Sequence, residues 1–130
     1  MKLGYTILYV ESVPDTVAFY EAAFGLARRM VAPSGDYAEM QTGETRLAFA
    51  ENAMVRTLTS VPFVAARPDQ AAPAMELGLV TADVEAAYAT AVAAGAVAVK
   101  RPETKPWGQV VGYVRDNNGF LVEICSPMES

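Results

Sequence analysis

The chain has no histidine among its 130 residues and only one cysteine, Cys125. Histidine is the commonest metal ligand and the usual general base near neutral pH, so histidine-containing catalytic triads and histidine-based zinc sites are excluded. A single cysteine forms neither an internal disulfide nor a thiolate cluster, and Cys125 lies in a strand-like segment, which favours a buried, inert thiol. Any acid–base chemistry would therefore fall to carboxylates, tyrosines or lysines.

The sequence also has no basic cluster and no long apolar run. Its net charge is −5, whereas nucleic-acid binding needs a basic stripe that neutralises phosphates. No apolar stretch approaches the roughly 18 residues of a membrane-spanning helix, and the first residues lack a signal-peptide cleavage pattern. We therefore expect a cytoplasmic protein with no nucleic-acid partner and no membrane association.

Residues 1–52 predict a strand, a helix and three further strands. Hydrophobic residues make up 52% of the whole chain and charged residues 19%, a balance typical of globular domains. Alternating residues 2–10 predict the first strand. Ser12 and Asp15 predict a helix start with a capping box, and Gly25 predicts its end. The remaining strands are expected at 27–32, 37–41 and 46–50, separated by glycine-containing turns.

The same order of elements begins again after a proline-containing connector, residues 53–74. Thr81 predicts the N-cap of a second helix, and Gly95 predicts its C-cap. Asp116-Asn117-Asn118-Gly119 predicts the turn of a closing hairpin. The elements of this half are expected at 75–80, 84–94 (the helix), 96–101, 109–115 and 120–126. The sequence therefore predicts an α+β fold of two βαβββ modules, one over about 1–52 and the other over about 75–130.

Three segments carry a resemblance to a known family: ILYVESVPDTVAFYEAAFGL, ELGLVTADVEAAYATAVAAGA and WGQVVGYVRDNNGFLVEICSP. Together with the duplicated modules, they resemble the glyoxalase/bleomycin-resistance/extradiol dioxygenase (vicinal oxygen chelate) superfamily over nearly the whole chain. The last segment is the most specific, because the family usually has a strand, a D-P-D-G turn and an apolar strand with one inward Glu. Here the turn reads D-N-N-G. The resemblance implies a single domain whose modules form a cup-shaped open barrel.

The resemblance also implies positions for a metal site. In metal-dependent members each module contributes two inward ligands, one from its first strand and one from its last, as a His/Gln/Glu set around a divalent ion. Carried over by position, the first-strand sites fall at Tyr5 and Glu76, and the last-strand sites fall at Ala48 and Glu123. Only the two glutamates are ordinary ligands. No metal or other cofactor is therefore expected, and a divalent metal, if one binds, would use Glu76 and Glu123.

Strand alternation places the same residues on one face without reference to the family. If intervening residues such as Leu8 and Val122 pack beneath the helices, the opposite face is polar in part. That face is expected to carry Tyr5, Ile7, Tyr9, Arg46, Ala48, Glu76, Gly78, Leu121 and Glu123. An inward carboxylate in an apolar strand is costly unless it is paired, hydrated or neutralised. The two glutamates therefore indicate a site, unless they lie at a wet rim or pair with Arg46 or Lys105.

The first functional hypothesis is a protein that binds a small aromatic or cationic molecule in this cup without a catalytic metal. Glu76 and Glu123 would attract the cationic or donor groups of the ligand. Trp107 would stack on a planar ligand and Gln109 would orient it, although a plain packing role for this tryptophan is an equal alternative. The candidate ligand-binding residues are Tyr5, Arg46, Glu76, Trp107, Gln109 and Glu123.

Two other functions stay open, so the sequence leaves enzymatic activity undecided. A divalent-metal-dependent lyase, isomerase or dioxygenase relative would use Glu76 and Glu123 as its remaining ligands, or one of them as a general base. A non-enzymatic interaction module would instead expose an apolar patch. The resemblance implies a homodimer, since family members usually complete or brace their cups across a two-fold interface.

Overall fold

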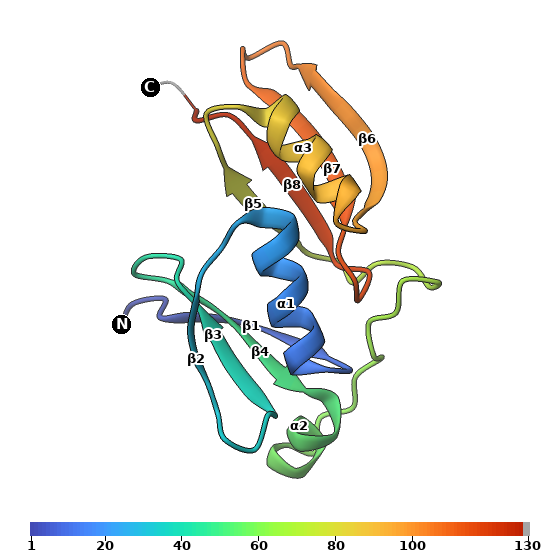
Figure 1. Ribbon diagram of the computed structural model, residues 1–130. Coiled ribbons are helices and arrows are strands. Elements are labelled where there is room, and N and C mark those ends of the chain that lie inside the picture. The colour runs from blue at the N-terminus through green and yellow to red at the C-terminus, as the bar shows by residue number, and fades with distance from the viewer. Residues whose placement is uncertain (129–130) are drawn as a thin grey trace. The chain divides into compact units, whose positions relative to one another are not determined.

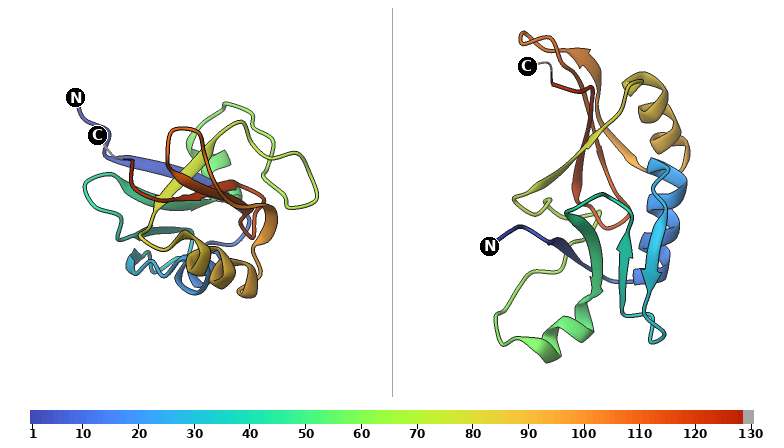
Figure 2. Two further views of the ribbon diagram at one scale, coloured as in Figure 1. Left: turned by 90° about the horizontal axis from the view of Figure 1, so that it is seen from above. Right: turned by 90° about the vertical axis from the view of Figure 1, so that its left-hand side faces the viewer.

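The computed structural model describes residues 1–128, so the predicted end of the second module at residue 130 lies outside the described residues. The chain forms two compact units, one ending at Ala66 and the other beginning at Arg67. Each unit contains one four-stranded sheet with a helix on one of its faces (Figure 1; Figure 2, right). The predicted α+β class and the two βαβββ modules are confirmed.

The first unit contains four strands and two helices. Its elements are β1 (Tyr5–Val10), α1 (Val13–Phe24), β2 (Arg28–Val31), β3 (Tyr37–Met40), β4 (Arg46–Glu51) and α2 (Asn52–Leu58). The strand order is β1-β4-β3-β2, in which β1 runs parallel to β4 and the other neighbours are antiparallel. We call this sheet 1. The parallel pair requires a crossover between its strands, and α1 supplies it.

Helix α1 begins and ends where the sequence predicts. The Ser12 hydroxyl oxygen accepts a hydrogen bond from the Asp15 backbone N–H at 3.3 Å, and Gly25 ends the helix with a φ of 66°. That left-handed conformation suits glycine, which has no Cβ. Tyr20 is fully buried and packs against Phe49 of β4, with 4.9 Å between ring centroids. The apolar side of sheet 1 therefore faces α1.

The second unit repeats the arrangement with four strands and one helix. Its elements are β5 (Glu76–Val80), α3 (Val84–Ala93), β6 (Val97–Thr104), β7 (Val110–Arg115) and β8 (Leu121–Cys125). The strand order is β5-β8-β7-β6, which we call sheet 2, with β5 parallel to β8. Val114 and Val122 are paired across β7 and β8 and are fully buried on the side of α3.

Helix α3 begins at the predicted residue, but its caps differ by one or two residues from the prediction. The N-cap is Asp83, whose carboxylate accepts from the Ala86 backbone N–H at 3.1 Å, and not Thr81. Thr81 instead donates its own backbone N–H to the Cys125 carbonyl at 2.9 Å, which extends the ladder between β5 and β8. Ala94 caps the C-terminus in place of Gly95. The prediction of the N-cap at Thr81 was wrong because the backbone of Thr81, one residue beyond the end of β5, still pairs with β8.

The predicted hairpin turn at 116–119 is confirmed, and an arginine ties it to the start of the second unit. Gly119 has a φ of 92°, and its carbonyl accepts from Arg115 Nε at 2.9 Å. The Arg115 Nη2 atom also donates to the Gln70 carbonyl at 2.7 Å and to the Arg67 carbonyl at 3.3 Å. This arginine therefore fixes the backbone of residues 67–70 against the turn.

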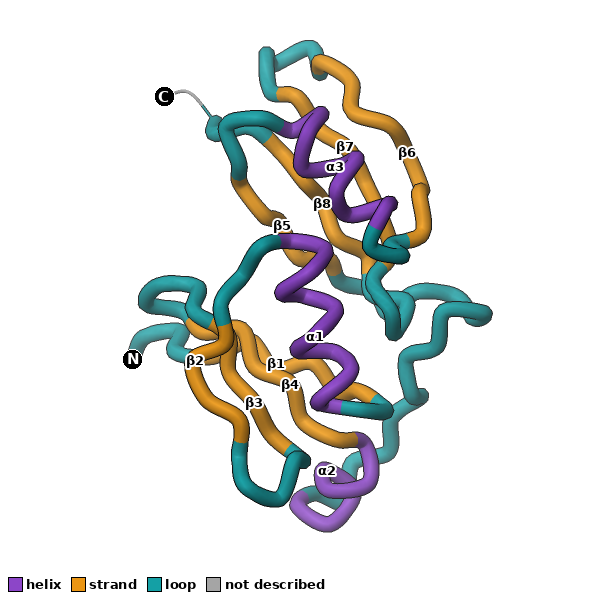
Figure 3. Tube along the Cα trace, viewed as in Figure 1, coloured by secondary structure: helices purple, strands orange, loops and turns teal. Residues whose placement is uncertain are grey.

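The connector contains a helix that the sequence analysis missed. Helix α2 has seven residues and no side-chain cap at its N-terminus, so it lacks the usual start signal. The segment from α2 to β5 is loop (Figure 3), and within it Phe63 packs on Tyr9, with 4.9 Å between ring centroids, and under the Arg56 guanidinium. Within residues 1–128, no helix has the length and apolar character needed to cross a membrane.

Candidate functional site

Each sheet has one face that its helix does not cover, which we call its open face. Successive strand residues point to opposite sides, so the residues that alternate with those facing α3 lie on the open face of sheet 2. On β5 and β8 the open face carries Glu76, Gly78, Val80, Leu121, Glu123 and Cys125, and on β7 it carries Tyr113. The two predicted glutamates therefore share one face of one sheet.

Glu123 lies at the centre of this open face and is half-buried. The Tyr113 hydroxyl donates a hydrogen bond to its Oε1 atom at 3.1 Å. Its Oε2 atom lies over Gly78, its register partner on β5, where an added Cβ would sit 3.9 Å from that oxygen. Because Gly78 has no side chain, space remains beside the second carboxylate oxygen.

The carboxylates of Glu76 and Glu123 influence the same neighbouring groups. Burial raises the pKa of the Tyr113 phenol, and the hydrogen bond to Glu123 and the charges of both glutamates raise it further. Burial likewise raises the pKa of the Cys125 thiol to about 11, again with contributions from both glutamates. The buried, inert thiol expected at Cys125 matches this environment.

The sequence left open a pairing of these glutamates with Arg46 or Lys105; within the second unit, the pairing with Lys105 is not found. Arg46 approaches Glu39, and Lys105 pairs with Glu103. Among the described residues of the second unit, no lysine or arginine lies within 4.0 Å of the carboxylate of Glu76 or Glu123. Glu76 is exposed to solvent, whereas Glu123 has a phenol as its polar neighbour in place of a cation.

The open face of sheet 1 carries the other predicted site residues. Tyr5 pairs with Arg46, and Ile7 pairs with Ala48, so all four point away from α1. Ala48 is fully buried. Its register partner on β3 is Glu39, and the register partner of Glu39 on β2 is Met30. The resulting row across the sheet is Ile7, Ala48, Glu39 and Met30.

Glu39 is a buried carboxylate that the sequence analysis missed. It is 8% exposed, and its Oε2 atom accepts a hydrogen bond from the Tyr37 hydroxyl at 2.9 Å. Its Oε1 atom lies 3.7 Å from Arg46 Nη1 and 3.8 Å from Arg29 Nε. Burial raises the pKa of Tyr37 to about 12, and the hydrogen bond to Glu39 and its charge add to the effect.

The two modules place their central carboxylate on different strands. In sheet 2, Glu123 of β8 faces Tyr113 of β7 in register. In sheet 1, the same two positions hold Ala48 of β4 and Glu39 of β3. The acidic group of the first module therefore lies one strand away from the position that the resemblance implies. An acidic residue at an inward position of the predicted strand 37–41 was the signal that could have revealed it.

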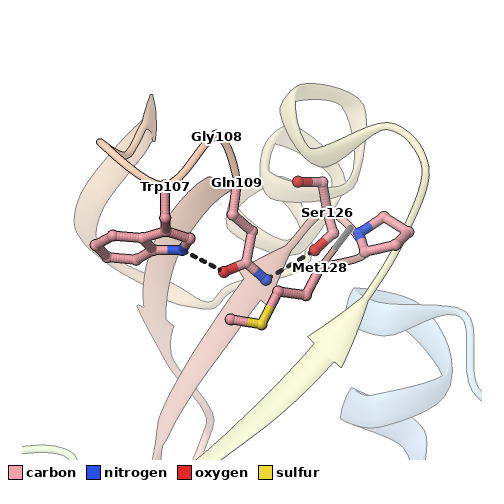
Figure 4. Close-up of a pocket in the computed structure, with 6 residues that line it drawn as sticks. Trp107, Gly108, Gln109, Ser126 and Met128 are labelled. Carbon is pink, nitrogen blue, oxygen red and sulfur yellow. Dashed lines mark hydrogen bonds between the residues drawn. The ribbon is translucent and has the colours of Figure 1, made fainter. Parts of the chain in front are cut away.

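Trp107 and Gln109 lie together at the turn between β6 and β7. The Trp107 indole N–H donates to Gln109 Oε1 at 2.9 Å, and Gln109 Nε2 donates to the Ser126 carbonyl at 2.9 Å (Figure 4). These residues line a hollow of about 240 Å³ together with Gly108, Pro127 and Met128. The indole is 62% exposed, so it is not a core packing residue.

The donor set does not fit a complete metal site of the kind that the resemblance implies. Tyr5 and Ala48 occupy two of its four positions, and a methyl group offers no donor atom. Within residues 1–128, no three or more His, Cys, Asp or Glu side chains form a group that could hold a metal ion. Glu76 and Glu123 are the carboxylates that the open face of β5 and β8 could offer a cation.

Known structures share the fold at low sequence identity. A glyoxalase-related enzyme from Fulvimarina pelagi is 22% identical with a TM-score of 0.84, covering 98% of this chain and 88% of that one. A glyoxalase/bleomycin resistance protein/dioxygenase from Nocardioides is 20% identical with a TM-score of 0.77, covering 100% and 85%. TioX from Micromonospora sp. ML1 is 20% identical with a TM-score of 0.73, covering 97% and 98%. These similarities establish the fold alone.

Sequence comparison identifies the family. A search of the curated proteins found no match. A family model described as Glyoxalase/Bleomycin resistance protein/Dioxygenase superfamily matches residues 2–124, which is nearly the whole chain. The duplicated βαβββ units agree with that match. The chain belongs to the glyoxalase/bleomycin resistance protein/dioxygenase superfamily.

Proposed function

We propose that the protein binds a small aromatic or amphipathic cation on the open face of sheet 2, without a catalytic metal. The observation that carries this proposal is the half-buried carboxylate of Glu123, which has a phenol and a glycine beside it and, among the described residues of the second unit, no basic side chain within 4.0 Å. A partly desolvated carboxylate without a counter-charge is costly, and a cationic ligand would offset that cost.

The residues around Glu123 favour a ligand that has a cationic group and an aromatic ring. The Tyr113 hydroxyl donates a hydrogen bond to the Oε1 atom of the carboxylate. The Oε2 atom lies beside Gly78, which has no side chain to fill the space next to it. Exposed Glu76 adds a second negative charge to the same face. Trp107 is exposed and hydrogen-bonded to Gln109, and the hollow that it lines includes neither Glu76 nor Glu123. We therefore assign it as a second contact, for the flat part of a ligand that extends to the turn between β6 and β7.

Calorimetry with 3-phenylpropylamine tests this proposal. We expect saturable binding that weakens about tenfold in Glu123→Gln, as expected for the loss of a charge-assisted hydrogen bond. Gly78→Val should also weaken binding, because its side chain would fill the space beside Glu123 Oε2. Glu85→Gln, which alters an exposed carboxylate on α3, is the matched control and should bind as the wild type does. Equal binding of 3-phenylpropan-1-ol would contradict the proposal.

Trp107 provides an independent signal, because it is the only tryptophan in the chain. Its fluorescence should change when 3-phenylpropylamine binds. Titration with Mn²⁺, Ni²⁺ and Zn²⁺ tests the alternative. Stoichiometric micromolar binding that disappears in Glu76→Gln and Glu123→Gln would favour a divalent-metal-dependent lyase, isomerase or dioxygenase over a metal-free binding protein.

We also propose that the protein is a homodimer, as its family resemblance implies. Support comes from strand β1, which lies at the edge of sheet 1 and carries Tyr5 and Ile7, 48% and 45% exposed. An edge strand with exposed apolar side chains favours association with another chain.

A further inference from the structure

Two guanidinium groups on the open face of sheet 1 approach a single buried carboxylate. Arg29 Nε and Arg46 Nη1 lie 3.8 and 3.7 Å from the same Oε1 atom of Glu39. Both distances exceed those of an ordinary N–H···O hydrogen bond. The local charge is therefore one positive unit, because two arginines face one glutamate.

The hydrogen-bonding capacity of these arginines is largely unused. In the part of the chain that the structure describes, neither guanidinium donates a hydrogen bond, and their side chains are 35% and 34% exposed. Each guanidinium has five N–H donors in a planar fork that matches a carboxylate. Glu39 cannot satisfy both forks, because its other oxygen is held by Tyr37. The pair therefore has donors available for a second, external anion.

The surroundings of the arginines are apolar and accessible. Tyr5 is the register partner of Arg46, and Met30 is the register partner of Glu39. Tyr5, Ile7 and Met30 are 48%, 45% and 40% exposed. Apolar side chains beside unused charged donors favour a ligand with one anionic end and one apolar end.

We infer that the open face of sheet 1 binds the carboxylate of a small amphipathic acid, with Arg29 and Arg46 as its cationic contacts. Tyr5 and Met30 contact the apolar part of that acid. Glu39 positions the two guanidiniums and competes with the ligand for them. This site goes beyond the proposed function, which concerns a cation on sheet 2, and neither site requires the other.

Amide chemical shifts in a titration with 3-phenylpropionate test the inference. We expect saturable shifts on β3 and β4 with 3-phenylpropionate, and none there with 3-phenylpropan-1-ol or 3-phenylpropylamine. Acetate should bind more weakly, because it has no apolar part. Arg29→Gln and Arg46→Gln should each weaken binding about tenfold, as expected for the loss of a charge-assisted contact.

Two further variants make the test specific. Arg28→Gln is the matched control, because Arg28 also lies on β2 but pairs with Glu21 of α1; it should bind as the wild type does. Glu39→Gln should bind the acid more tightly, since the competing charge is removed. Because Glu39→Gln retains both arginines, it remains informative if the arginine variants fail to fold.

The inference is overturned by any of three results. These are no saturable shift on β3 and β4, equal binding of the neutral alcohol, or unchanged affinity in folded Arg29→Gln and Arg46→Gln. Shifts on β7 and β8 with 3-phenylpropylamine report the proposed function in the same experiment. Failure of one site is therefore distinguished from failure of the other.

Discussion

Gly119 occupies a backbone position that no other residue fits. Its φ is 92°, and an added Cβ would lie 2.6 Å from the Arg67 carbonyl oxygen and 2.7 Å from Arg115 Nη2. We expect Gly119→Ala to lower the free energy of unfolding by about 3 kcal/mol, through the disfavoured conformation and the displaced backbone. Urea denaturation measures this change.

Gly108 is the matched control for this substitution. It has a φ of 96°, but an added Cβ would have no neighbour within 4 Å in the described residues. Gly108→Ala should therefore cost about 1 kcal/mol, the conformational part alone. Equal losses in the two variants would show that the close approach to Arg67 contributes nothing.

Tyr37 should make part of the stability depend on alkaline pH. Its pKa is raised from 10.0 to about 12, first by burial and then by Glu39. A raised pKa favours the protonated phenol in the folded state, so this contribution is present below the unfolded pKa of 10.0 and is lost as pH rises through 12. We expect ultraviolet absorbance to show one tyrosine ionising near pH 12.

The corresponding step should be absent in Tyr37→Phe and present in Tyr113→Phe. Stability measured in urea should also fall less between about pH 10 and pH 12 in Tyr37→Phe than in the wild type. If Tyr37→Phe leaves the absorbance change near pH 12 intact, the phenol is not held protonated by its surroundings.

At the scale of elements, Arg115 joins the connector to the hairpin between β7 and β8. Its guanidinium donates to the carbonyls of Arg67, Pro68, Gln70 and Gly119. Arg115→Ala removes all four bonds, so we expect faster amide hydrogen exchange at 67–70 and a loss of about 2 kcal/mol in stability.

Arg115→Lys should rescue little, because an ammonium group cannot span carbonyls in several directions. Arg101→Ala is the control, since Arg101 is exposed on β6 and has no hydrogen bond or ion pair within the described ranges. Exchange at 67–70 that is equally slow in the wild type and Arg115→Ala would refute this role.

Elements with strong local signals could be predicted from the sequence, and those without could not. Ser12 and Gly25 predict the ends of α1 because both act through their own backbone neighbours. Helix α2 has no side-chain cap, so nothing local marked it. The N-cap was wrongly predicted at Thr81 because the backbone of Thr81 pairs with Cys125, a residue far away in the sequence.

The candidate site was predictable in the same limited sense. Alternation placed Glu76 and Glu123 on one face of a sheet, which the register confirms. Their lack of a basic partner and the buried position of Glu39 depend on which strands are neighbours. Strand order is a tertiary property, so the pairing of Arg46 with Glu39 could not be deduced from spacing.

At the scale of the whole molecule, the duplicated units differ in the charge of their open faces. Sheet 2 presents Glu76 and Glu123, and sheet 1 presents Arg29 and Arg46 around Glu39. Both faces derive from the same strand order. The two units thus share a strand order while their open faces differ in charge, and on such a fold the ligand specificity of each open face can differ independently.

The edges of the two sheets also differ, which bears on self-association. Edge strand β6 carries Lys100 and Pro102 and has two register shifts, features that discourage pairing with another chain. Edge strand β1 has no such protection over Tyr5–Val10 and exposes Tyr5 and Ile7. We therefore expect the homodimer to form through β1 and not through β6.

Sedimentation equilibrium should give a mass about twice the 13.9 kDa of the chain. Ile7→Lys should reduce this mass to that of the monomer, because it places a charge in the interface, whereas Val99→Lys on β6 should leave the dimer intact. Val99 is a suitable control because it is 53% exposed, close to the 45% of Ile7. A monomeric wild type would reject the dimer, and dissociation by Val99→Lys alone would move the interface to β6.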